Sequence, residues 1–149
     1  MISTENIFNG LNLLVLLGWI ALFIFPYSKF TKKIIEGLYL PFILCAFYIY
    51  FLSQTKGLFS ADFSSLTGIL DLFKSSTEES AAAGWIHYLA FDYFVGCWIV
   101  NHSIKKGIPY IIFIVPLIFT LFAGPFGLLL FLIFRLIYKR FTLKNAEHN

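Results

Sequence analysis

Two ionisable residues, His87 and Asp92, stand inside an apolar stretch of the sequence that runs from Ala81 to Val100. An apolar run of about 20 residues is long enough to cross a bilayer. A charged side chain at the centre of a spanning helix costs roughly 2.5–3.5 kcal/mol on insertion scales, so such groups normally face protein or water and have a partner. Histidine and aspartate also transfer protons in catalysis. We therefore take His87 and Asp92 as the candidate catalytic residues.

Helical geometry separates these two side chains. At 100° per residue, positions five apart on a helix point about 140° away from each other, so His87 and Asp92 do not form one chelating pair. Three interpretations stay open: hydrogen bonds between helices, an acid/base site in a cavity, or a metal site. Because the sequence offers few further ligands, we expect no metal and no cofactor.

Each polar group then needs a partner from another span, and the charged candidates are Glu36 and Arg135. Arg135 is expected to reach toward the lipid headgroups, with an inward ion pair to Asp92 or Glu36 as the alternative. His102 follows the apolar run and is expected to be solvated or to cap the end of the helix.

Aromatic residues surround the two polar positions, and a Gly-Pro pair interrupts a later apolar run. Aromatic side chains in such a run also serve as lipid-facing bulk, and the Gly-Pro pair is equally typical of a simple helix kink. As the sharper alternative, a broken helix exposes backbone groups to a ligand. The residues expected to line a ligand pocket are Trp85, Tyr88, Phe91, Trp98, Gly124 and Pro125.

The composition indicates an integral membrane protein of one domain, residues 1–149. Hydrophobic residues make up 59% of the chain and charged residues 13%, against about 45–50% and 25% in soluble domains; mean hydropathy is +0.82. Basic residues cluster at the ends of apolar runs, which favours contact with membrane lipids and not with nucleic acid. The first run lacks the basic flank of a signal peptide and follows no Arg- and Ser-rich transit segment, so a prokaryotic plasma membrane is expected.

We predict an all-α, polytopic bundle of four transmembrane helices, at about residues 7–25, 34–52, 81–100 and 109–132. An interfacial or re-entrant helix at about 62–74 lies between spans two and three, and residues 141–149 form a polar tail. Apolar residues recur at helical spacing in this short helix, and Asp62 or Ser64 could cap it.

Four spans place both termini on the same side of the membrane. Termini on opposite sides would indicate a re-entrant segment, either Gly57–Lys74 or the break at Gly124-Pro125. The basic residues do not decide the orientation, since four crossings divide them almost evenly between the two sides.

The run Ala83-Gly84-Trp85-Ile86-His87-Tyr88-Leu89-Ala90-Phe91-Asp92-Tyr93-Phe94-Val95-Gly96, together with Gly124-Pro125-Phe126-Gly127-Leu128-Leu129 and Arg135, resembles the abscisic-acid-deficient-type family. These are small multi-pass membrane proteins of bacteria and photosynthetic organisms, and the resemblance covers nearly the whole chain. Plant members are implicated in forming neoxanthin from violaxanthin. The resemblance therefore implies chemistry on, or binding of, a polyene epoxide, with the family's shared polar residues at His87 and Asp92.

This chain departs from the family pattern in one place: Asn101-His102 stands where an acidic residue is expected. Its composition looks bacterial, so violaxanthin itself does not carry over. The leading hypothesis is a membrane protein that binds or chemically rearranges an isoprenoid or carotenoid-type lipid, by isomerisation or epoxide opening if it is an enzyme. The alternative is a non-catalytic assembly factor or a small permease-like carrier. A lipophilic isoprenoid ligand and a second copy of the chain are the expected partners besides lipids.

Overall fold

The computed structural model describes residues 3–55, 57 and 61–147, with side chains as far as Thr142. The described part of the chain is helical, as predicted, and contains no strand. The helices are α1 (Thr4–Ile24), α2 (Lys29–Gly37), α3 (Tyr39–Gln54), α4 (Leu66–Lys74), α5 (Glu78–Lys105) and α6 (Tyr110–Glu147). Helix α6 thus continues through most of the predicted polar tail, whose last two residues, 148–149, lie outside the described part.

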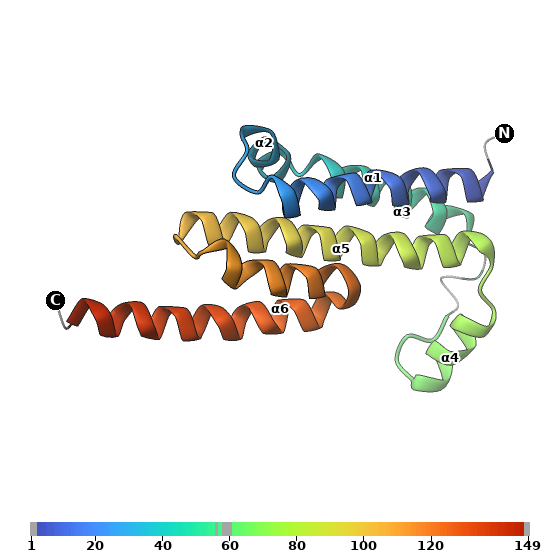
Figure 1. The fold of residues 1–149 in the computed structure, drawn as a ribbon. Coiled ribbons are helices and arrows are strands. Elements are labelled where there is room, and N and C mark those ends of the chain that lie inside the picture. The colour runs from blue at the N-terminus through green and yellow to red at the C-terminus, as the bar shows by residue number, and fades with distance from the viewer. Residues whose placement is uncertain (1–2, 56, 58–60, 148–149) are drawn as a thin grey trace.

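Helix α5 is the central element, and α1, α3 and α6 all pack against it (Figure 1). It begins with a capping box, in which the Thr77 hydroxyl accepts from the Ser80 N–H and the Ser80 hydroxyl accepts from the Thr77 N–H. Small residues let the neighbouring helices approach closely. A β-carbon at Gly96 would collide with the indole of Trp19 on α1, and one at Gly18 would collide with the ring of Tyr93.

The second predicted span is divided between two helices. Leu38 has a left-handed backbone (φ 49°, ψ 29°), which ends α2 and begins α3. Helix α2 is amphipathic: Thr31 and Ile35 are buried, whereas Lys32 and Lys33 are exposed. Figure 1 shows α2 nearly end-on at one end of the bundle, while the long helices run across the view. The predicted start of this span, near residue 34, therefore belongs to a helix that lies across the bundle's end.

Helix α6 folds back on itself. Ala123 is not helical (φ −153°, ψ 64°), and the chain reverses there (Figure 1). A straight helix would carry Tyr138 about 42 Å from Tyr110, at 1.5 Å per residue. Instead, the Tyr138 hydroxyl donates to the carbonyl oxygen of Gly107, just before α6, over 3.1 Å. The single bent span predicted for residues 109–132 is therefore not confirmed, since the chain forms a helical hairpin here.

The sequence at the turn explains the reversal. Pro125 has no N–H and cannot bond to the carbonyl four residues before it. Gly127 allows the two arms to touch, because a β-carbon there would collide with the backbone nitrogen of Thr120. The Thr120 hydroxyl is buried and donates to the Pro116 carbonyl over 2.9 Å. The arm from Tyr110 to the turn is about 20 Å long, shorter than the roughly 30 Å hydrocarbon core of a bilayer.

Three helical stretches in the described part of the chain are long and apolar enough to cross a membrane: Thr4–Ile24, Lys29–Gln54 and Tyr110–Thr142. These apolar helices indicate a membrane protein. The four single crossings predicted from the sequence are not confirmed, because α5, which contains the predicted span at 81–100, is not one of these stretches and the third stretch contains the hairpin. The start of α1 and the end of α6 lie at opposite ends of the bundle (Figure 1).

Helix α4 corresponds to the predicted short helix at 62–74 and stands apart from the long helices (Figure 1). Its cap is Ser65, whose hydroxyl accepts from the Gly68 N–H over 3.0 Å, and not Asp62 or Ser64 as predicted. Asp62 instead accepts from the Ser64 N–H over 2.8 Å and from the hydroxyls of Ser64 and Ser65. No residue of α4 is buried. Residues 58–60 of the preceding segment lie outside the described part.

Candidate functional site

The structure places Asp92 at the turn of the α6 hairpin. Its side chain is half-buried on α5, and its carboxylate packs against Gly124, the buried residue that follows the reversal at Ala123. A β-carbon at Gly124 would collide with this carboxylate, so glycine is what allows the close approach. Within the described residues, no hydrogen bond or ion pair occupies the Asp92 carboxylate. A half-buried carboxyl group without a partner among the described residues is thus present in an apolar bundle.

The second arm of α6 begins beside this carboxylate. The first N–H groups of a helix have no partner within the helix, and the aligned peptide dipoles give that end a partial positive charge. A negative charge at the turn is therefore favoured electrostatically, which offsets part of the cost of keeping it in an apolar setting. The arrangement places a carboxyl group, which can exchange a proton, directly against the turn of the hairpin. The four cavities described in this structure are lined by other residues.

His87 lies elsewhere on α5 and does not share this position. Its ring is exposed and contacts Tyr48 of α3, with centroids 5.7 Å apart, and Phe91, at 4.8 Å. Asp92 instead faces α6. The divergence predicted from helical geometry is therefore present in the structure, and the two candidate catalytic residues are not brought into one cavity.

Three of the six predicted pocket residues are aromatic side chains near the middle and start of α5. The Trp85 indole N–H donates to the Asn12 side-chain oxygen over 2.9 Å and so ties α5 to α1. Trp85 also lines an open hollow of about 450 Å³ between the starts of these two helices. Tyr88 and Phe91 are largely exposed on the outside of the bundle. Of the other predicted pocket residues, Gly124 touches Asp92 and Pro125 is exposed at the turn.

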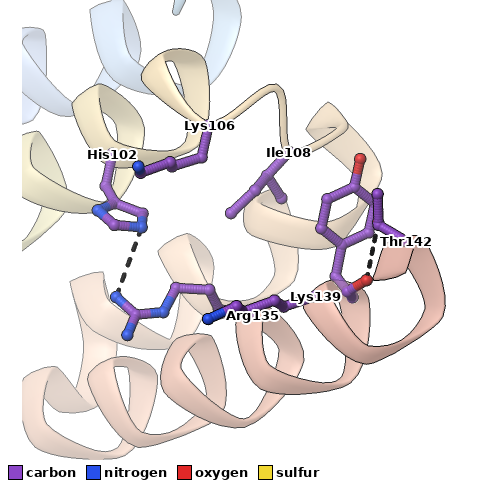
Figure 2. Close-up of a pocket in the computed structure, with 7 residues that line it drawn as sticks. His102, Lys106, Ile108, Arg135, Lys139 and Thr142 are labelled. Atoms are coloured by element: carbon purple, nitrogen blue, oxygen red, sulfur yellow. Dashed lines mark hydrogen bonds between the residues drawn. The ribbon is translucent and has the colours of Figure 1, made fainter. Parts of the chain in front are cut away.

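Trp98 belongs to a separate cluster at the end of α5. Its ring lies 5.3 Å from that of His102 and 5.5 Å from that of Phe131 on the second arm of α6. Arg135 points into the same place, with its Nη1 3.4 Å from His102 Nε2 (Figure 2). His102 lies in the last turn of α5, and its half-buried ring also packs between two helices, which the prediction of a solvated or helix-capping residue did not include.

The predicted secondary partners do not reach Asp92. Arg135 lies against His102, and among the described residues it forms no ion pair with Asp92 or Glu36. Glu36 forms an exposed pair with Lys32 on α2, with 3.8 Å between Nζ and Oε1. Sequence reasoning missed the pairing of His102 with Arg135, 33 positions apart, because it requires the hairpin. The signal for it was a Gly-Pro pair in the middle of an apolar run that has basic residues at both ends.

Potential metal ligands are scattered. In the part of the chain that the structure describes, no three His, Cys, Asp or Glu side chains gather closely enough to hold an ion. Cys97 is buried in the core and Cys45 is exposed, and both are free thiols.

Comparison with known proteins gives one match. No curated protein and no solved structure matches the chain. The family model described as ABA DEFICIENT 4-like matches residues 6–131, which include the α5 segment around Asp92 and the turn of α6. Because this match covers most of the sequence and both halves of the candidate site, the chain belongs to the ABA DEFICIENT 4-like family.

Proposed function

We propose that this protein is embedded in the plasma membrane of a prokaryote and binds and rearranges an isoprenoid-type lipid, with Asp92 transferring a proton. The observation that carries the proposal is the half-buried Asp92 carboxylate, which packs against Gly124 and has no hydrogen-bond or ion-pair partner among the described residues. Membership of the ABA DEFICIENT 4-like family supports it further. An ionisable group kept in an apolar bundle without a partner is costly, and such groups generally mark functional sites.

One carboxyl group is sufficient for this chemistry. Opening an epoxide with formation of a new double bond requires one proton delivered to the oxygen and one proton removed from a carbon atom. The sum is an isomerisation that consumes no oxidant or reductant. A carboxyl group that alternates between its acid and its carboxylate form performs both transfers. His87 is not needed for this, because it lies toward α3 and away from the turn of α6.

The proposed arrangement in the membrane is based on how the helices pack against α5. In our proposal, α1, α3 and α5 cross the bilayer, and α6 enters from one side and returns to it. Non-helical backbone at membrane depth is tolerated where protein buries it or where it lines a cavity. At the turn, Gly124 is buried against α5, whereas the non-helical Ala123 is exposed. Helix α4 would lie in the interface, with Phe63, Leu66, Leu70 and Phe73 toward the lipid, since all four are largely exposed.

The test compares Asp92→Asn with Asp71→Asn. The amide in Asp92→Asn keeps the shape of the side chain but cannot exchange a proton. Asp71 is a matched control, since its carboxylate is exposed on α4 and pairs with Lys74 over 3.7 Å. Each protein is expressed in cells that make isoprenoid lipids and purified in mild detergent. The isoprenoid pool of the cells and the lipids that co-purify are then read by absorption and mass spectrometry.

We expect the wild-type chain and Asp71→Asn to alter the isoprenoid pool without any ion gradient and to retain a lipophilic ligand. Asp92→Asn should assemble normally, lose the conversion and retain less ligand. If Asp92→Asn behaves like the control in both measurements, Asp92 contributes only to packing. A non-catalytic assembly factor or a gradient-dependent carrier would then be the better description.

A further inference from the structure

A cavity of about 350 Å³ opens between the end of α5, the Gly107–Pro109 connection and the second arm of α6 (Figure 2). Its volume falls within the range of small-molecule sites, roughly 300–1,000 Å³. Asp92 lies about 15 Å from it along α5, at 1.5 Å per residue, so this cavity is distinct from the site proposed above. The residues that line it are His102, Lys106, Ile108, Arg135, Tyr138, Lys139 and Thr142.

The charge of this cavity is strongly unbalanced. Lys106, Arg135 and Lys139 carry positive charges, and no acidic side chain lines the cavity. The ion pairs within the described part of the chain are Lys32 with Glu36 and Lys74 with Asp71, so none of the three cations is neutralised. Three unpaired cations around one hollow repel each other, and a multiply charged anion between them would remove that repulsion.

The bond to His102 fixes the position of Arg135. An arginine side chain only donates hydrogen bonds, so His102 Nε2 accepts from Arg135 Nη1 over 3.4 Å and this histidine is neutral in that arrangement. His102 is in turn held by ring contacts with Trp98 and Phe131, at 5.3 and 6.0 Å. The guanidinium is thus oriented in advance, with further N–H groups available. Its planar fork matches the oxygen atoms of a phosphate, and the lysines add charge.

We propose that this cavity binds a phosphate group. A phosphate carries enough negative charge to balance several of the lining cations, which a single carboxylate does not. The cavity joins an apolar interior, since Ile108 lines it and the aromatic cluster of Trp98 and Phe131 lies behind His102. Basic pockets at the ends of membrane helices bind the phosphates of lipid headgroups, and a free phosphate would make the same contacts.

The experiment measures binding of two phosphate probes to the full-length protein in mild detergent. Dioctanoyl phosphatidic acid tests the lipid source, inorganic phosphate tests the free source, and dioctanoylglycerol has the same tails without the phosphate. The variants are Arg135→Gln and Lys139→Gln. Arg140→Gln is the matched control, because Arg140 is the neighbouring, exposed basic residue and does not line the cavity.

We expect the wild-type chain to bind at least one phosphate probe saturably and not to bind dioctanoylglycerol at the cavity. Binding of the phosphate probe should be about tenfold weaker in Arg135→Gln and Lys139→Gln and little changed in Arg140→Gln. Saturable binding of phosphatidic acid alone assigns the site to a lipid, and saturable binding of inorganic phosphate alone assigns it to a free phosphate. If Lys139→Gln binds both probes as well as Arg140→Gln does, the proposal is overturned. Lys139 is exposed, so its substitution keeps the test valid even if Arg135→Gln fails to fold.

Discussion

At the scale of single residues, Asp92 and Gly124 act as a pair. The glycine lets the hairpin turn reach the carboxylate, and the carboxylate occupies the space that a side chain at Gly124 would need. Neither residue explains the site alone. A carboxylate in an apolar bundle requires polar or oppositely charged groups nearby, and a helix break within a membrane must be buried by protein or line a cavity. The sequence marked both positions as candidates, but their contact depends on the fold.

Replacing Gly124 by alanine tests this pairing. The added methyl group collides with the Asp92 carboxylate, so we expect Gly124→Ala to lower the free energy of unfolding by about 1–3 kcal/mol, as overpacking usually does. Gly84→Ala on α5 is the control, since no atom lies within 4 Å of its β-carbon position. It should be neutral or stabilising by up to roughly 1 kcal/mol. Denaturation in mixed micelles measures the free energy of unfolding of both variants. Equal changes in the two variants would argue against the contact between Gly124 and Asp92.

At the scale of the elements, the sequence predicted where helices form better than where the chain turns. Most residues of α1, α3 and α5 belong to apolar runs, so their composition defines them as helices. The break at Leu38 was not predicted, because a leucine with positive φ has no sequence signal and arises from the packing around it. At Gly124-Pro125 the residue types indicated a bend. Its size depends on contacts between the arms, such as that of Gly127 with Thr120, which only the folded chain provides.

The start of α4 carries a prediction about pH. Hydrogen bonds from the hydroxyls of Ser64 and then Ser65 lower the pKa of Asp62 from its ordinary 3.8 to about 2. Because the folded pKa is depressed, this stabilisation of the turn is complete above pH 3.8 and disappears as the pH falls through about 2. We expect the amide proton shift of Ser64, followed by NMR, to titrate with a midpoint near 2. In Asp62→Asn it should stay constant, whereas a wild-type midpoint near 3.8 would show that these bonds do not form.

At the scale of the whole molecule, the hairpin gathers positive charge at one end. With α6 folded back, the basic residues of its second arm join those of α2 and of the end of α5 (Figure 1). In the described part of the chain, only Lys74 lies toward the other end. Four crossings would divide the basic residues almost evenly between the two sides, whereas in the folded chain most of the described basic residues lie at one end of the bundle. Since basic residues favour the cytoplasmic side, we expect the end that carries α2 and the end of α6 to be cytoplasmic, and the start of α1 to be outside.

Labelling of the two ends in intact cells tests this account most directly. Single cysteines at Asn6, near the start of α1, and at Thr142, on the second arm of α6, are introduced after replacement of Cys45 and Cys97; both introduced positions are exposed. We predict that a membrane-impermeant thiol reagent labels Asn6→Cys from outside and Thr142→Cys only after the cells are permeabilised. A cysteine at Ser76, exposed near the start of α5, should behave like Asn6→Cys. Labelling of Asn6→Cys and Thr142→Cys from the same face would mean that α6 crosses the membrane once, and would contradict the hairpin that brings Gly124 to Asp92.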